Sequence, residues 1–99
     1  MIMDPARIHA QQEMDDEIMH YVRGMQNTAP IRAQSVASYL KSVRRRRVTE
    51  AEVNLRLDYL VDKGWLKTSK EWEPGIGDVE YYEITADGSD ILDGVKPRD

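Results

Sequence analysis

The sequence predicts a mostly helical α+β fold with a three-helix core, a β-hairpin and a short C-terminal helix. Apolar residues at helical spacing fill the first two thirds of the chain, a helix-capping pattern lies at its centre, and aromatic and β-branched residues follow Gly64. A chain of 99 residues with 40% hydrophobic content suits one compact core. We expect one domain at 13–94, a partly helical N-terminal extension at 1–12 and a flexible tail at 95–99.

The first helix is predicted between Glu13 and Met25. Met14, Ile18 and Val22 recur there at the spacing of an amphipathic helix. Asp4-Pro5 resembles a helix start, so the preceding extension is expected to be helical in part. Asn27 to Pro30 ends the helix, because the residue before a proline is pushed out of helical geometry. A very short strand is expected at Ile31-Arg32.

The second helix is predicted from Gln34 up to the run of arginines, with its end left open. The third helix is marked by a capping box, in which the Thr49 oxygen accepts from the Glu52 amide and the Glu52 carboxylate reaches back to the Thr49 amide. Lys63 and Gly64 supply the cation and the glycine that commonly end a helix.

Two strands are predicted after the third helix, at Trp65–Thr68 and Val79–Ile84. The segment between them, Ser69 to Asp78, contains one proline and two glycines and is expected to be a long, turn-rich loop. Thr85 is expected to cap a final helix that buries Ile91 and Leu92.

Charge is unevenly distributed along the chain, although the net charge is only -4. Residues 31–67 carry nine basic and four acidic side chains, whereas residues 68–99 carry three basic and nine acidic ones. A basic segment of this size steers an anionic partner, while the acidic remainder argues against a protein that coats nucleic acid indiscriminately.

Several classes of function find no support in the sequence. The chain has no cysteine, no enzyme motif and no cofactor motif, and neither His9 nor His20 is given a role. The acidic side chains at 15–17 point in different directions on a helix, so we expect them to be solvated rather than to bind a metal. Neither a membrane-spanning run nor a signal peptide is found, so the expected location is cytoplasmic.

Two stretches resemble winged helix-turn-helix domains. The segment from Val53 to Leu66 is similar to the recognition helix and its exit into the wing, and the segment from Tyr82 to Gly88 is similar to the second wing strand running into Y-x-[IL]-T-x-x-G. Both are typical of small bacterial regulators related to the MarR and PadR groups, and the resemblance covers roughly residues 14–93, most of the chain.

The resemblance implies a prokaryotic or phage-like transcriptional regulator that binds double-stranded DNA in a sequence-specific way. The third helix would enter the major groove while the wing touches the adjacent backbone. A homodimer is also expected, because most operators are two-fold, with the first helix and its extension or the C-terminal segment as the contact.

The expected DNA contacts lie at the start of the third helix, along it and in the wing. Phosphate contacts are expected from the arginine run, and Arg56 with Asn54 would lie nearest the bases. The full set is Arg44, Arg45, Arg46, Arg47, Thr49, Asn54, Arg56, Lys63 and Lys70.

Each of these contacts has an alternative interpretation. The arginines would equally serve as a helix end that pairs with Asp15, Asp16 or Glu17. Arg56 would pair with Glu52 one turn away. For Leu55 and Tyr59 the two interpretations are contact with a thymine methyl or a partner surface, and packing against an extended second helix.

The predicted wing departs from the family pattern because Lys70 is its only basic residue among several acidic ones. Glu52 on the third helix would also repel phosphate. A second hypothesis is therefore a protein-interaction module that uses the wing. Its expected contacts are Glu71, Trp72, Glu73 and Ile76, and the alternative for Trp72 is that it folds back onto the hairpin.

Overall fold

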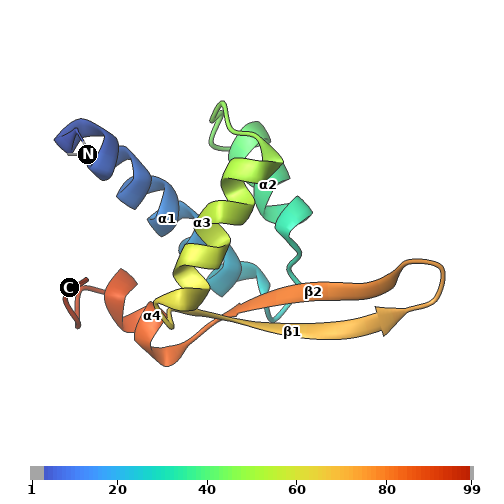
Figure 1. Ribbon diagram of the computed structural model, residues 1–99. Helices are drawn as coiled ribbons and strands as arrows, with labels where there is room; N and C mark the ends of the chain where they lie inside the picture. Colours follow the sequence, from blue (N-terminus) through green and yellow to red (C-terminus); the bar gives the residue numbers. More distant parts are fainter. Residues whose placement is uncertain (1–3, 99) are drawn as a thin grey trace.

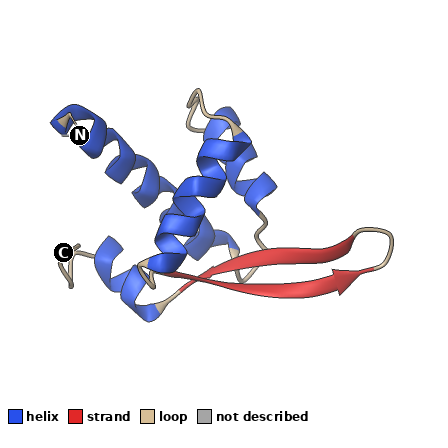
Figure 2. Ribbon diagram, viewed as in Figure 1, coloured by secondary structure: helices blue, strands red, loops and turns tan. Residues whose placement is uncertain are grey.

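A computed structural model describes residues 4–98 of the chain, and these residues form four helices and one antiparallel hairpin. Figure 2 shows the helices gathered together and the hairpin extending away from them. The mostly helical α+β class is therefore confirmed, and the order of elements is compatible with a winged-helix layout. The elements are α1 (Pro5–Met25), α2 (Ala33–Ser42), α3 (Glu50–Asp62), β1 (Leu66–Glu73), β2 (Gly77–Ile84) and α4 (Ala86–Leu92).

Helix α1 begins at Pro5, earlier than the predicted Glu13, and is continuous through the expected extension. The Asp4 side chain accepts a hydrogen bond from the Ala6 amide at 3.1 Å, and proline at the first helical position needs no amide partner. Every described residue up to Ala10 is exposed, whereas Ile18 and Val22 are fully buried. The first turns of α1 therefore project from the core (Figure 1).

The core lies where α1, α2 and α3 meet the base of the hairpin. Fully buried side chains of α2 and α3 meet there, and the rings of Tyr21 and Tyr39 stack with their centroids 4.4 Å apart between α1 and α2. The α2 and α3 members are Val36, Leu40, Val53, Leu57 and Leu60. Apolar burial of this kind is the main stabilising contribution to the fold.

The arginines lie in a turn and not in a helix, because α2 ends at Ser42 and α3 begins at Glu50. The connection between α2 and α3 therefore covers residues 43–49. Thr49 caps α3 as predicted, with its side-chain oxygen accepting from the Glu52 amide at 3.1 Å, but the expected return bond from the Thr49 amide to the Glu52 carboxylate is not among the hydrogen bonds of residues 4–98.

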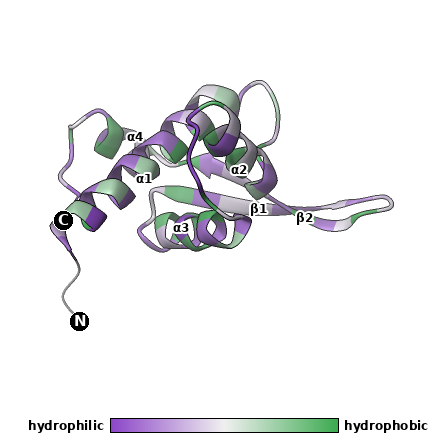
Figure 3. Cartoon of the chain, turned by 90° about the horizontal axis from the view of Figure 1, so that it is seen from above, coloured by the Kyte–Doolittle hydropathy of each residue, from purple (hydrophilic) through white to green (hydrophobic). Residues whose placement is uncertain are grey.

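The hairpin is longer than the sequence suggested, and the prediction of a long loop from Ser69 to Asp78 is wrong. Backbone pairing continues through Lys70 opposite Glu80 to Glu73 opposite Gly77, leaving a short turn at residues 74–76. Polar side chains are tolerated along β1 after Leu66 because they are exposed to water, whereas Val79, Tyr81 and Tyr82 of β2 are buried. Figure 3 shows that the hairpin also extends beyond the helices when seen from above.

The base of the hairpin is held by hydrogen bonds to Ile31 and to Gln26. The Tyr82 amide donates to the Ile31 carbonyl at 2.8 Å, which confirms a one-residue bridge at Ile31 in place of a two-residue strand. The Ile84 amide donates to the Gln26 side chain at 2.8 Å. Thr85 caps α4 by accepting from the Gly88 amide at 3.0 Å. As expected, α4 buries Ile91 and packs Leu92 against the core.

The segment after α4 turns back toward α1. The Val95 amide donates to the Asp90 carbonyl at 2.9 Å, and Arg98 forms an ion pair with Asp16. Residues 1–3 and 99, which belong to the predicted extension and tail, lie outside the described residues.

Candidate interaction surfaces

The arginine turn, defined as Arg44 to Arg47, closes the end of α2 and points its side chains in different directions. The Arg46 amide donates to the Leu40 carbonyl at 2.9 Å, and Arg45 adopts a left-handed backbone with φ 55°. A non-glycine residue in this region is uncommon and marks a sharp change of direction. Alternate side chains of the arginine turn therefore face α1 and solvent.

Glu17 of α1 binds two arginines of this turn at once. Arg46 donates from Nε and from an Nη atom at 2.6 and 2.8 Å, and Arg44 donates at 3.0 Å. The hydrogen bond from Arg46 is the main cause that lowers the pKa of the Glu17 carboxyl to about 2, against partial burial that acts to raise it. The alternative of pairing with the acidic run of α1 is confirmed for Arg44 and Arg46.

Arg45 and Arg47 are the two members of the turn that remain exposed and outside the ion pairs of residues 4–98. The structure thus divides the four consecutive arginines into two that hold α1 and two that face solvent. Only the second pair is free to contact an external anion without giving up an internal one.

Arg56 points from α3 toward α1 and does not pair with Glu52. It donates to both oxygens of Asp15 at 2.9 and 2.6 Å, in a bidentate geometry. The Asp15 side chain is only 2% exposed, so the prediction that this acidic run is solvated is wrong at Asp15. Burial raises the pKa of the Asp15 carboxyl, and the contact with Arg56 acts in the opposite direction. Arg56 is therefore committed to an interior ion pair.

Cations and aromatic rings stack where α3 leads into β1. The Arg56 guanidinium lies 4.4 Å from the centroid of the Tyr59 ring, and Lys63 lies 5.8 Å from the same ring and 5.7 Å from that of Trp65. Tyr59 is 38% exposed and meets Trp65 edge to face. It consequently packs beside Arg56 and Trp65, and not against α2.

The outward side of α3 is acidic and only weakly apolar. Asn54 is exposed there as predicted, and Leu55 is 68% exposed, so neither belongs to the core. Thr49 is exposed but is used as the cap. The acidic residues exposed along this helix are Glu50, Glu52, Asp58 and Asp62.

The hairpin tip, defined as residues 71–78, carries apolar side chains that nothing covers among the described residues. Trp72 is 70% exposed and Ile76 is 64% exposed, so Trp72 does not fold back onto the hairpin. Glu71 and Asp78 are exposed beside them, while Glu73 accepts a hydrogen bond from the Tyr81 hydroxyl. Lys70 lies exposed opposite Glu80, one step nearer the helices. The hairpin tip therefore presents exposed apolar side chains surrounded by acidic residues.

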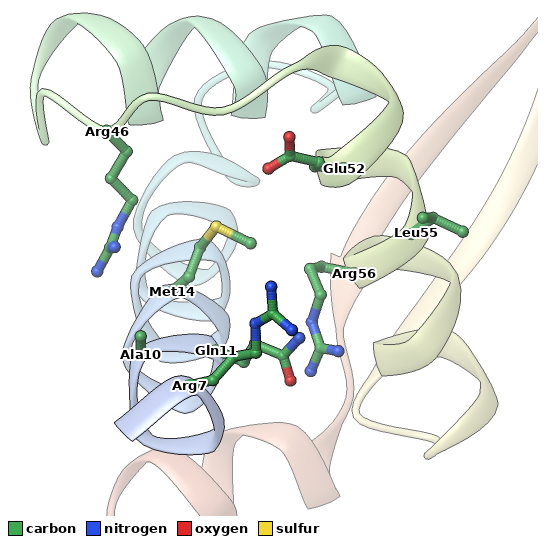
Figure 4. A pocket seen from close by; sticks show the side chains of 8 residues that line it. All are labelled: Arg7, Ala10, Gln11, Met14, Arg46, Glu52, Leu55 and Arg56. Atoms are coloured by element: carbon green, nitrogen blue, oxygen red, sulfur yellow. The ribbon is translucent and has the colours of Figure 1, made fainter. Parts of the chain in front are cut away.

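A pocket of about 430 Å³ lies between the first half of α1, the arginine turn and α3. Figure 4 shows Met14 between two groups of polar side chains, with Arg7, Gln11 and Arg56 gathered on one side and Arg46 on the other. Its remaining lining residues are Ala10, Glu52 and Leu55. We call this the α1–α3 pocket.

The pocket was not anticipated, although its α1 side had a signal in the sequence. Arg7, Ala10, Gln11 and Met14 lie at the three- and four-residue spacing of one helix face. Of these four residues only Met14 is both apolar and large, so they do not form the apolar stripe that marks a buried helix face. The partnership of this face with α3 depends on how the helices cross.

None of the helices between residues 4 and 98 is both long and apolar enough to cross a lipid bilayer. Over the same residues, no three histidine, cysteine or acidic side chains are grouped so that they could hold a metal ion. No protein-family model matches the sequence, and no curated protein matches it significantly.

Proposed function

We propose that this chain is a winged-helix protein-interaction module whose hairpin tip binds a protein partner. The observation that carries the proposal is the exposure of Trp72 and Ile76, 70% and 64%, at the end of a hairpin that extends away from the core (Figure 1). Exposed apolar groups that gather at one place are typical of interaction sites, and tryptophan is enriched among the residues that dominate binding energy.

The charge around the tip favours protein over nucleic acid. Glu71 and Asp78 flank Trp72, and a carboxylate close to a phosphate is repelled. A partner surface with basic or neutral groups and a cavity for an indole ring is complementary to this tip. The acidic surround would then set which partners are accepted, and the apolar groups would supply most of the affinity.

The charge of the surface that winged-helix proteins present to DNA also favours a protein partner over DNA. A groove between α2, α3 and the hairpin is lined by Asp58, Asp78 and Glu80, with Arg32 as its basic residue. Arg56, which the sequence placed nearest the bases, pairs with Asp15 on the α1 side of α3. Base recognition through this groove would therefore begin with an unfavourable electrostatic term.

Site-specific photo-crosslinking tests the proposal directly. A benzoylphenylalanine at position 72 is expected to give a cross-linked product with a protein partner in cells of the source organism. The same group at position 67, exposed near the base of β1, is the matched control and is expected to give none. Absence of any protein cross-link from position 72 would refute the proposal.

Duplex DNA is a second candidate ligand, favoured by one observation. Arg45 and Arg47 are exposed and unpaired among the described residues, and they lie next to the start of α3. Two phosphate contacts at this place would give a modest, salt-dependent affinity.

The DNA hypothesis is tested by fluorescence anisotropy with a labelled duplex at about 50 mM salt. Changing Arg45 and Arg47 to Ala is expected to weaken binding and to reduce the slope of log K against log salt by about two. The matched control changes Arg44 and Arg46 to Ala, which removes the same charge from the internally paired positions. No binding by the unchanged chain would exclude this candidate.

A further inference from the structure

We propose that the hairpin tip binds the α1–α3 pocket of a second copy of this chain, and that two copies exchange tips to form a closed dimer. This inference rests on the proposed function, because it identifies the partner of the tip. It is carried by three features of the described residues: the chemistry of the tip, the chemistry of the pocket and the positions of the two on the molecule.

One cation of the pocket is free to meet the acidic tip. Three arginines and one glutamine line the pocket together with Glu52, but Arg46 and Arg56 are already paired with Glu17 and Asp15. Arg7 takes part in none of the ion pairs of residues 4–98, so it is available to an incoming carboxylate. Glu71 and Asp78 on the tip are exposed; Asp78 is the cross-strand partner of Trp72, and Glu71 precedes Trp72 on β1. Contacts between Arg7 of the pocket and a carboxylate of the tip would be charge-assisted hydrogen bonds.

The surfaces are also complementary in shape and polarity. The pocket has a volume of about 430 Å³, within the range of sites that enclose a small organic group. Met14, Ala10 and Leu55 supply apolar lining for an indole ring. The Arg7 guanidinium can also stack on the face of that ring, an arrangement that is favourable for guanidinium and tryptophan. The most exposed apolar side chain of the tip thus has a suitable site.

The positions of the two surfaces allow a closed assembly. Figure 1 shows the start of α1 and the hairpin tip at opposite ends of the molecule, whose longest extent is 45 Å. When two copies lie antiparallel, each tip reaches toward the α1 end of its partner, and both contacts form under one two-fold axis. One tip in one pocket is a small contact, and the reciprocal arrangement doubles the buried area.

Sedimentation velocity of the purified chain from micromolar to millimolar concentration tests the inference. We expect a monomer–dimer equilibrium that weakens as salt is added, because the contacts at the pocket opening are between charged groups. Trp72→Ala and Ala10→Glu are each expected to raise the dissociation constant about tenfold or more, the scale of losing a central interface side chain.

The controls separate the pocket from general effects. Ala51→Glu makes the same change at an exposed position of α3 outside the pocket, and Lys41→Glu matches the charge change of Arg7→Glu. Both controls are expected to leave the dimer unchanged, whereas Arg7→Glu weakens it. Circular dichroism checks that each variant is folded.

Several outcomes would overturn the inference. These are a monomer at every concentration, assembly beyond a dimer, or a dimer that persists in the Ala10→Glu variant. The cross-link from position 72 distinguishes this failure from failure of the proposed function. A product of twice the chain mass supports the inference, a product with a different protein leaves only the proposed function standing, and no product contradicts both.

Discussion

At the scale of single residues, two carboxylates of α1 determine what the arginines do. Glu17 takes Arg44 and Arg46, and Asp15 takes Arg56, so three of the residues expected on DNA contribute to the fold. A buried or half-buried carboxylate without its cation is costly, so these pairs are expected to be stable features of the folded chain. Arg45 and Arg47 of the arginine turn are left outside these ion pairs.

The Glu17 contact predicts an acid-sensitive contribution to stability. The pKa of this carboxyl is about 2 in the folded chain, below its ordinary value of 4.5. It therefore binds a proton more readily when unfolded, and acid favours unfolding. The stabilisation is complete above about pH 4.5 and is lost as the pH falls toward 2. Urea unfolding across this range is expected to show a loss of about 1–2 kcal/mol.

Glu17→Gln is expected to remove that part of the pH dependence. Glu13→Gln is the matched control, because Glu13 is more exposed and lies 4.0 Å from Arg46. The wild-type slope between pH 4.5 and 2 should be retained in the control. An identical slope in Glu17→Gln would show that the contact does not stabilise the folded chain.

The Asp15 and Arg56 pair predicts strong coupling between two positions. Asp15→Asn leaves Arg56 without its anion in a half-buried site, and we expect the free energy of unfolding to fall by about 3–5 kcal/mol. Asp15→Leu combined with Arg56→Met removes both charges and is expected to recover much of the loss. Chemical denaturation of the two variants tests this, and equal losses in both would contradict it.

At the scale of elements, the joint between the hairpin and α4 has no room for a side chain at Gly88. A Cβ atom on Gly88 would lie 2.1 Å from the Trp65 carbonyl oxygen and 2.9 Å from the Ile84 side chain. The Thr85 hydroxyl also donates to the Gly64 carbonyl at 2.6 Å across this joint. Backbone from three elements therefore meets without space for a side chain.

Gly88→Ala is expected to destabilise the chain by at least about 2 kcal/mol, because the backbone must move to admit the methyl group. Gly24→Ala is the matched control, since a Cβ there meets nothing within 4 Å inside helix α1. Because alanine favours a helix, the control is expected to stabilise by about 0.5–1 kcal/mol. Thermal unfolding measures both changes, and shifts of the same sign would refute the account of this joint.

At the scale of the whole molecule, folding and association use different parts of α1. The second half of α1 contributes buried side chains to the core, while its first turns are exposed and form one side of the α1–α3 pocket. The hairpin is divided in the same way, with Tyr82 buried at the base and Trp72 exposed at the tip. The two ends of the molecule can therefore carry interactions without weakening the core.

Deleting residues 1–9 is expected to change the free energy of unfolding by less than about 1 kcal/mol, because the described side chains removed are all exposed. The same deletion removes Arg7 and is expected to weaken self-association. Denaturation and sedimentation of the truncated chain measure the two effects separately. A large loss of stability would show that the first turns of α1 belong to the folding unit.

The sequence by itself determined the elements and most of their ends. Helical spacing, the Thr49 and Thr85 caps, and Gly64 are local signals, because each depends on residues within one or two turns. The hairpin was recognised but its loop was made too long, since proline and glycine indicate a turn without fixing where pairing stops. Pairing of Lys70 with Glu80 and of Ser69 with Tyr81 joins residues that are well separated along the sequence, so no local signal predicts it.

Only the tertiary structure decided the roles of the charged residues. An arginine in a helix looks the same in sequence whether it faces solvent or a carboxylate 41 positions away, as Arg56 of α3 faces Asp15. The crossing of α1 with α3 and with the arginine turn buries that pair, places Glu17 between Arg44 and Arg46, and forms the α1–α3 pocket. The interaction between two charged groups depends on their separation in space, and the local sequence does not fix that separation.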